Sequence, residues 1–226
     1  MESIEIFNQL KQKVDSMVYR DNLRPVSVNK QITVGWESAL GSPPSNSSEI
    51  TKRELKYLSD ITKSLTIKQK NLIRLVDDDP YNLFTPILKD KRLKFDKENL
   101  NKVWNIASDV ITNLKIKFNR PRPEQLAPVY GLKINVIETD THQTPAYPSG
   151  HTSYAAFCAY LLADTYPEHS SSFFAQVGVA GYARCIQGVH YPSDNEAAMT
   201  ISGVIWEELK YKMFPELYPT YGELDV

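Results

Sequence analysis

Three helical patterns follow one another closely in the C-terminal half of the sequence, and they decide more about the fold than any other feature. They run from Ser149 to Asp164, from Ser171 to Gly188 and from Ser193 to Lys212. The windows Tyr154–Ala163 and Phe173–Tyr182 are the most apolar in the chain, but a membrane span needs roughly 18 to 20 apolar residues. We therefore expect buried core helices and no transmembrane segment.

The N-terminal half carries further helical patterns separated by loops. Residues 24–48 are rich in proline, glycine and serine, which predicts a long loop. Thr51 with Glu54 and Thr66 with Gln69 each match a capping box at a helix start. The first helix is predicted from apolar residues at helical spacing, namely Ile4, Phe7, Leu10, Val14 and Met17.

The middle of the chain continues this helical pattern. The sequence Asp77-Asp78-Asp79-Pro80 ends a helix, and a solvated helix end is favoured over a cation site because a hard cation needs more oxygen ligands. Asp96 is expected to cap a helix that Pro121 and Pro123 end. Only Leu132–Ile137 resembles a strand. The sequence therefore predicts an all-α protein.

Composition and charge exclude several classes of protein. Hydrophobic residues make up 42% and charged residues 23% of the chain, which is ordinary for a globular protein. With 226 residues we expect one domain, 1–226, whose motif-bearing core covers about 98–212. A net charge of -1 gives no general attraction to nucleic acids. Cys158 and Cys185 lie in apolar helical patterns, which predicts buried free thiols.

The first residues of the chain bear on its location. They contain early acidic residues and lack the apolar core of a signal peptide. We therefore expect a soluble, cytoplasmic protein, or a periplasmic or secreted one if a signal peptide had been removed. The sequence leaves a homo-oligomer open.

The segment Tyr182–Asp194 combines the groups needed to handle a phosphoryl group. Arg184 comes six residues before His190, and Asp194 follows it by four. Just after Pro192, Asp194 should lie at a helix start, where its carboxylate reaches back to a ring N–H of His190. The other ring nitrogen would then be free as a nucleophile. The alternative is a packed loop histidine beside an aspartate that only complements the helix dipole.

The sequence Pro148-Ser149-Gly150-His151 precedes the first of the three C-terminal helices. Ser149 is a good N-cap, and a helix N-terminus offers free N–H groups and partial positive charge to an anion. Gly150 allows close approach to the backbone, and His151 could protonate a leaving group. The alternative is a plain capped helix with an exposed histidine.

The segment from Lys115 to Pro123 concentrates positive charge, because four basic residues occur in it without an acid. Lys115 lies in the last turn of a helix, where the helix dipole also favours a cation. Arg122 lies between two prolines, and a stiffly held arginine suits bidentate binding of phosphate. Taken alone, the segment is equally typical of a solvated basic helix end.

Together these segments match a three-part signature, Lys-x6-Arg-Pro, Pro-Ser-Gly-His and Arg-x5-His-x3-Asp. The chain thereby resembles the type 2 phosphatidic acid phosphatase superfamily. That superfamily includes bacterial class A acid phosphatases, membrane lipid phosphatases and vanadium haloperoxidases. The resemblance is carried by Lys115, Arg122, Pro123, Pro148, Ser149, Gly150, His151, Arg184, His190 and Asp194.

The resemblance implies a helical bundle of the acid phosphatase and vanadium-dependent haloperoxidase type, and a metal-independent hydrolase of phosphoric monoesters or diphosphates. His190, oriented by Asp194, would form a phosphohistidine, and His151 would protonate the leaving group. The phosphoryl oxygens would be bound by Lys115, Arg122, Ser149, Gly150 and Arg184. The expected substrate is small and phosphorylated, including a lipid or isoprenoid phosphate. No cofactor is expected, although vanadate would bind as an inhibitor.

The sequence departs from the family pattern at two positions. Ala183 precedes Arg184 where the family usually has serine, which would remove a hydrogen bond to the anion. Glu124 follows Pro123 where soluble acid phosphatases often have phenylalanine, which would place a negative charge near the rim of the site. The rim itself is expected from residues 24–48 or 124–147.

Four other functions stay open at this stage. A vanadium haloperoxidase would hold vanadate, as its cofactor, on His190, although such enzymes are usually much longer chains. A membrane lipid phosphatase conflicts with the lack of an apolar span. A non-catalytic anion-binding protein on the same scaffold conflicts with the intact catalytic groups. A metallohydrolase could be built from His142, His151, His190 and Asp194, where His142 is otherwise a surface or rim histidine.

Overall fold

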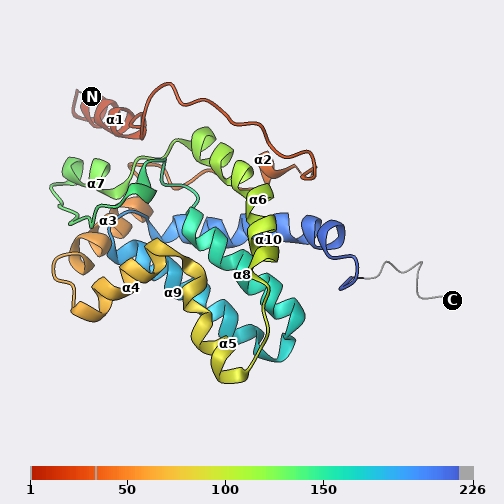
Figure 1. The fold of residues 1–226 in the computed structure, drawn as a ribbon. Coiled ribbons are helices and arrows are strands. Elements are labelled where there is room, and N and C mark those ends of the chain that lie inside the picture. The colour runs from red at the N-terminus through yellow and green to blue at the C-terminus, as the bar shows by residue number, and fades with distance from the viewer. Residues whose placement is uncertain (1, 34, 219–226) are drawn as a thin grey trace.

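The computed structural model describes residues 2–33 and 35–218, and this part of the chain is helical without strands (Figure 1), as the sequence predicts. The long helices are α1 Glu2–Asp15, α3 Glu49–Ile61, α4 Ile67–Asp78, α6 Lys97–Phe118, α8 Gly150–Thr165, α9 Ser170–Ile186 and α10 Pro192–Met213. The short helices are α2 Trp36–Ala39, η1 Pro80–Leu83, α5 Thr85–Lys91, α7 Pro123–Leu126, η2 Ala127–Tyr130, η3 Asp140–His142 and η4 Pro167–His169.

Helix α8 lies at the centre of the fold and crosses α10 (Figure 1). Its small and apolar side chains, including Ala155, Phe157 and Ala159, are fully buried against α6, α9 and α10. Small residues allow close helix packing, and each large buried side chain contributes roughly 1.5–3 kcal/mol. Cys158 in the same helix is buried and free, and so is Cys185 of α9, as predicted.

A second, smaller cluster fastens α3 to the connection between α9 and α10. Leu55 and Leu58 of α3 are fully buried there beside Leu126, Cys185 and Tyr191. The cluster holds one face of α3 next to the residues that follow α9, including the predicted nucleophile. It therefore supports the site from a helix far away in the sequence.

Several predicted helix ends are confirmed and one is wrong. The capping box of Thr66 and Gln69 is present, and the Asp96 side chain caps α6. Helix α3 instead begins after Ser48, whose side chain accepts a hydrogen bond from the Thr51 N–H. Glu54 consequently lies in the second turn of α3 and is buried, which frees its carboxylate for contacts elsewhere.

Helix α1 exists, but two residues of its predicted apolar face, Ile4 and Leu10, are exposed. Ile4 is 67% exposed and Leu10 is 58% exposed. Val14, near the C-terminal end of α1, and Met17, just after it, pack against the second cluster. The side chain of Phe7 lies outside the described residues.

The segment Leu132–Ile137 is irregular rather than a strand. Its backbone donors serve other elements: the Asn135 N–H donates to Thr62 Oγ1 at 3.2 Å, and the Ile137 N–H donates to the Gln187 carbonyl at 3.1 Å.

Within the described residues, no helix combines the length and hydropathy needed to cross a membrane.

Candidate active site

A glycine turn at the end of α9 sets the path of the chain into the site. Gly188 has φ of 86°, and its N–H donates to the Cys185 carbonyl at 2.9 Å while Val189 N–H donates to Arg184 at 3.2 Å. This is the Schellman pattern that ends helices at a left-handed residue, where glycine is favoured. It directs Val189 and His190 inward, and both are buried.

His190 and Asp194 make the contact that their spacing predicts. Asp194 lies in the first turn of α10, and its Oδ2 is 3.1 Å from His190 Nδ1. The same oxygen accepts a hydrogen bond from the Tyr191 N–H at 2.9 Å. Because a carboxylate accepts, Nδ1 carries the proton and Nε2 keeps its electron pair. Asp194 is fully buried and His190 is 2% exposed.

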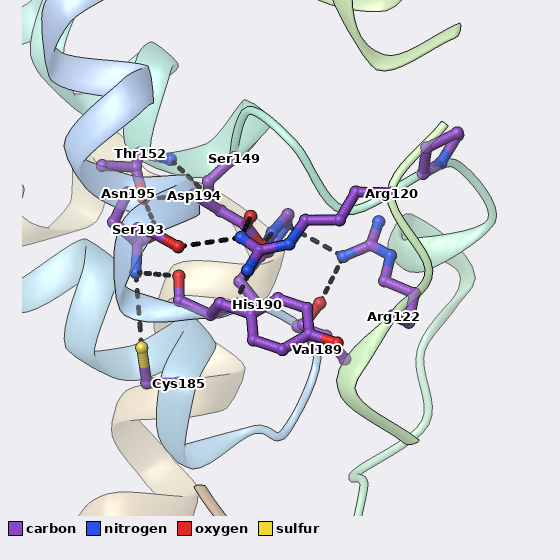
Figure 2. Close-up of polar contacts among 12 residues, drawn as sticks. Arg120, Arg122, Ser149, Thr152, Cys185, Val189, His190, Ser193, Asp194 and Asn195 are labelled. Atoms are coloured by element: carbon purple, nitrogen blue, oxygen red, sulfur yellow. Dashed lines mark hydrogen bonds and ion pairs between the residues drawn. The ribbon is translucent and has the colours of Figure 1, made fainter. Parts of the chain in front are cut away.

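Arg122 approaches the other side of the same ring (Figure 2). Its Nη1 lies 2.9 Å from His190 Nε2 and donates to the Val189 carbonyl at 2.6 Å. Its Nε donates to the Thr144 carbonyl at 2.8 Å. These contacts hold the guanidinium against the predicted nucleophile.

Lys115 lies in the last turn of α6, as predicted, and its Nζ donates to the Pro145 carbonyl at 2.9 Å. Burial, with repulsion from Arg122 and Arg184, holds the pKa of Lys115 well below its usual value. A Cβ atom at Gly150 would lie 3.9 Å from Lys115 Cε. The lysine therefore reaches the N-terminus of α8.

At this N-terminus, Ser149 caps α8 by accepting a hydrogen bond from the Thr152 N–H. The N–H of Ser149 itself donates to the backbone carbonyl of Asp194 at 3.0 Å. This donor therefore joins the second motif to the third, and the binding of phosphate at Ser149 stays a prediction. Gly150 is the first residue of α8, where N–H groups lack intrahelical partners.

Arg184 enters the site from the last turn of α9. Its Nη1 donates to Asp77 Oδ1 at 2.6 Å, and its Nη2 donates to Thr141 Oγ1 at 3.2 Å. Its Nε is buried and has no hydrogen-bond partner among the described residues. The expectation that the acidic triplet is only a solvated helix end is wrong for Asp77, whose carboxylate is partly buried at the site.

His151 lies in the first turn of α8 with its Nε2 4.0 Å from Asp77 Oδ1. Burial and the Arg184 guanidinium lower the pKa of His151 from 6.5 to about 3, although Asp77 acts in the opposite direction. The pKa of His190 is also held well below its usual value. Burial is the largest cause, and the positive charges of Arg122 and Lys115 come next. Both rings are therefore neutral in a strongly cationic environment.

Sequence reasoning missed two further residues that join this network. Arg120 Nη1 donates to Asp194 Oδ1 at 2.6 Å, and its Nη2 donates to Glu54 Oε2 at 3.1 Å. Arg120 was visible only as one cation among four, and Glu54 only as part of an apparent capping box. Neither signal indicates that the two side chains meet over a separation of 66 residues.

The two departures from the family pattern differ in their exposure, because Ala183 is buried and Glu124 is partly exposed. Ala183 is fully buried in the main hydrophobic cluster, and the hydrogen bond that a serine there would add stays a prediction. Glu124 lies in α7, and its Oε2 is buried without a hydrogen-bond partner among the described residues. Burial raises the pKa of Glu124. Whether this charge affects the rim of the site stays a prediction.

Residues 139–146, which belong to the later of the two segments predicted as a rim, contact the site residues. Thr141 binds Asp77, Thr144 accepts from Arg122, and Pro145 accepts from Lys115. His142 is half-buried in this segment, where burial and the charges of Arg122 and Arg184 lower its pKa.

A cavity of about 430 Å³ opens beside His151. One wall carries the aromatic side chains of Trp104 and Tyr154, whose rings meet edge to face with centroids 5.4 Å apart. The end of α4 supplies a second, acidic wall, and the full lining is Asp77, Asp78, Asp79, Pro80, Trp104, Thr141, Gly150, His151 and Tyr154. Between residues 2 and 218, position 34 aside, no three histidine, cysteine or acidic side chains are placed to hold a metal ion.

Comparisons with known proteins find similar phosphatases. The chain is 24% identical over 136 residues to a non-specific acid phosphatase of Salmonella typhimurium, covering 57% of this chain and 53% of that protein. It is 30% identical over 73 residues to a non-specific acid phosphatase of Salmonella typhi, covering 32% of this chain and 29% of that protein. The chain thus spans about half the length of the first relative and less of the second.

Solved structures are also similar, among them a transmembrane PAP2-type phosphatidylglycerolphosphate phosphatase from Bacillus subtilis. Its TM-score is 0.49 at 15% identity, with 77% of this chain and 90% of that chain covered. The family model described as PAP2 superfamily matches residues 103–216. That match covers just over half of the sequence and includes all three motifs, so the chain belongs to the PAP2 superfamily.

Proposed function

We propose that this protein is a phosphohydrolase that cleaves phosphoric monoesters or diphosphates through a phosphohistidine on His190. The observation that carries this proposal is the His190–Asp194 contact of 3.1 Å within a buried group of cations. Asp194 fixes the proton on Nδ1, which leaves Nε2 as the nucleophile. The names of the Salmonella relatives, non-specific acid phosphatases, support the same reaction class.

The first step transfers the phosphoryl group to the protein. His190 Nε2 attacks phosphorus while the bond to the leaving oxygen breaks, and His151 gives its proton to that oxygen. Negative charge spreads over the three remaining oxygens, where preorganised cations stabilise it. Lys115, Arg122 and Arg184 supply this charge, so the step requires no metal ion.

The second step releases phosphate. His151, now neutral, accepts a proton from water as the water oxygen attacks phosphorus. The bond from phosphorus to Nε2 breaks, and its electron pair returns to His190. The neutral state of His151 fits this base role directly, whereas its acid role in the first step requires a raised pKa. A phosphate ester supplies negative charge that offsets Arg184, the main electrostatic cause of the lowered pKa.

Arg184 supports phosphate binding through an independent feature. A buried guanidinium N–H without a partner is unfavourable by roughly 1–3 kcal/mol, and Arg184 Nε is such a group among the described residues. An oxyanion would satisfy it. Arg122 must also turn from His190 Nε2 toward the phosphoryl oxygens before the attack takes place.

The cavity beside His151 is the natural place for the leaving group, because His151 is the proton donor. Its aromatic wall favours flat or apolar groups, and its acidic wall disfavours a second anionic group. A small phosphomonoester, including a lipid or isoprenoid monophosphate presented in water, therefore fits this cavity better than a diphosphate or a nucleoside triphosphate.

A substrate panel tests the proposal. The protein is assayed on an aryl phosphate, nucleotides, pyrophosphate and lipid phosphates, with and without a chelator and vanadate. We expect turnover that resists the chelator, is inhibited by vanadate and is lost in His190→Ala. Rapid quenching should trap labelled phosphate on the protein in an acid-labile, alkali-stable bond.

Other outcomes would reject this function in favour of a named alternative. Phosphate binding without turnover on the whole panel would indicate an anion-binding protein. Peroxide-dependent bromide oxidation after vanadate loading, without phosphatase turnover, would indicate a haloperoxidase. Wild-type turnover by His190→Ala would exclude the phosphohistidine route.

A further inference from the structure

Buried charged groups extend beyond Asp194, beginning with Arg120, which contacts its carboxylate (Figure 2). Arg120 is 2% exposed, and its guanidinium carbon lies 3.8 Å from the centroid of the Tyr191 ring. Its Nη1 donates to Asp194 Oδ1 at 2.6 Å and to Ser193 Oγ at 2.8 Å. The guanidinium is therefore held both by its hydrogen bonds and by an aromatic face.

Glu54 completes this group of charges from α3, which lies outside the segment matched by the family model. Its Oε1 accepts a hydrogen bond from the Ser193 N–H at 2.7 Å. Its Oε2 accepts from Arg120 Nη2 at 3.1 Å and from Ser193 Oγ at 3.0 Å. Burial raises the pKa of Glu54, but Arg120 and Ser193 oppose this, and every partner is a donor, as an ionised carboxylate requires.

These contacts divide the two oxygens of Asp194 between different tasks. Oδ1 accepts from Arg120, while Oδ2 accepts from His190 Nδ1 and the Tyr191 N–H. A carboxylate held on both oxygens cannot rotate, so the orientation of the His190 ring depends on Arg120. The arginine in turn is fixed by Glu54.

The charge of Glu54 matters as well as its hydrogen bonds. The other groups that act on His190 are Arg122 beside α7, Lys115 of α6, Arg184 of α9 and His151 of α8, and all of them disfavour a positive ring. Asp194 opposes them, but its charge is shared with Arg120. The carboxylate of Glu54 offsets the positive charge of Arg120. The negative charge of Asp194 is then less neutralised by Arg120 and stabilises the phosphorylated imidazole more strongly.

We infer that Glu54 and Arg120 form a positioning pair that orients Asp194 and preserves its charge for His190. Neither side chain touches the reacting atoms, so they are positioning residues rather than catalytic ones. The inference rests on the proposed function for its kinetic consequences, but the geometry of the His190–Asp194 contact can be measured without turnover.

The test is Glu54→Gln, which keeps the shape of the side chain and an oxygen for the Ser193 N–H. We expect kcat on an aryl phosphate to fall about tenfold, in the range of coupling between contacting residues, while KM changes less than about twofold. In NMR spectra of the protein without phosphate, the His190 Nδ1–H proton should move upfield and exchange faster with solvent. Glu49→Gln is the matched control, because Glu49 lies on the same helix and its exposed carboxylate pairs with Lys52, away from the site.

A lone buried cation can destabilise a protein, so a second variant changes both partners. Glu54→Met with Arg120→Met removes the two charges together and should remain folded. We expect the same loss of kcat and the same change at the His190 Nδ1–H proton.

The outcomes separate this inference from the proposed function. A fall in kcat without any change at the His190 proton would show a merely structural role and overturn the inference. Unchanged kcat and an unchanged His190 proton in both variants would also overturn it. If the wild-type protein turns over no phosphoester, the proposed function fails, and the NMR comparison alone decides whether Glu54 and Arg120 position Asp194.

Discussion

Arg122 Nη1 lies 2.9 Å from His190 Nε2, the nitrogen that attacks phosphorus in the proposed mechanism. The guanidinium therefore has two effects on the site. It offers N–H groups for the phosphoryl oxygens, and its charge is the largest electrostatic cause of the lowered His190 pKa after burial.

The first prediction follows from this contact. Arg122→Ala should lower kcat/KM by about 100- to 1,000-fold, the usual effect of removing one oxyanion donor. It should also raise the pKa of His190 toward its ordinary value, measured by NMR titration. Arg122→Lys keeps the charge but loses the planar, forked guanidinium. Its kcat/KM should lie between those of the wild type and Arg122→Ala. Equal rates in the wild type and Arg122→Ala would contradict the assigned role.

The second prediction concerns Asp77, which binds Arg184 at 2.6 Å and lies 4.0 Å from His151 Nε2. Asp77→Asn removes the charge that raises the His151 pKa. Because His151 must be protonated to act as the acid, the alkaline limb of kcat should move to lower pH. The rate at neutral pH should fall about tenfold, part of the usual contribution of a general acid.

Asp78→Asn is the control for this change. Asp78 is the neighbouring residue in the same acidic triplet, and its side chain is exposed. Its pH profile should match that of the wild type. Similar shifts in both variants would mean that the general negative charge of the cavity matters rather than the contact of Asp77 with His151 and Arg184.

The difference between these neighbouring aspartates shows what the sequence could and could not predict. The contact of His190 with Asp194 follows from a spacing of four residues across a helix start, so it depends only on local geometry. The cap at Ser149 and the three C-terminal helices are local in the same sense. They were predicted within one or two residues of their observed bounds.

The parts that were missed depend on long-range packing. Glu54 reaches Ser193 across 139 residues, and Asp77 reaches Arg184 across 107. Such pairs leave no periodic signal, because each partner also has an ordinary local interpretation as a capping or terminal acid. For α1 the local prediction of a helix is right, but two apolar residues of its predicted face are exposed. Helical spacing predicts the helix and does not show whether another part of the protein covers its apolar face.

The third prediction tests the glycine turn that precedes His190. Gly188 has φ of 86°, and a Cβ atom there would lie 2.8 Å from Ile134 Cγ2. Gly188→Ala therefore combines left-handed strain with a clash, and the free energy of unfolding should fall by about 1–3 kcal/mol. Turnover should also fall, because Val189 and His190 follow directly. Urea unfolding and kcat measure the two effects.

Gly178→Ala provides the comparison on the same helix. A Cβ atom at Gly178 meets nothing within 4 Å, and alanine is favoured over glycine in a helix by about 0.5–1 kcal/mol. This variant should gain stability and keep its turnover. A stable, fully active Gly188→Ala would show that the turn does not constrain His190.

The last prediction concerns the pH dependence of stability. His151 has a pKa of about 3 in the folded protein against an ordinary value of 6.5. Between these values the unfolded chain binds a proton that the folded protein does not, so the free energy of unfolding falls as the pH falls below 6.5. From pH 7 to pH 5 this group alone should remove about 2 kcal/mol. His190, whose pKa is also lowered, acts in the same direction.

The variant His151→Gln isolates this contribution, because every other titrating group stays in place. Urea unfolding of both proteins at pH 7, 6 and 5 gives the difference in stability at each pH. The wild type should lose about 2 kcal/mol more than the variant over this range. Added phosphate should reduce the loss in the wild type, because a bound anion offsets the Arg184 charge that keeps His151 neutral. Parallel pH profiles for the two proteins would show that His151 is not held neutral by its surroundings.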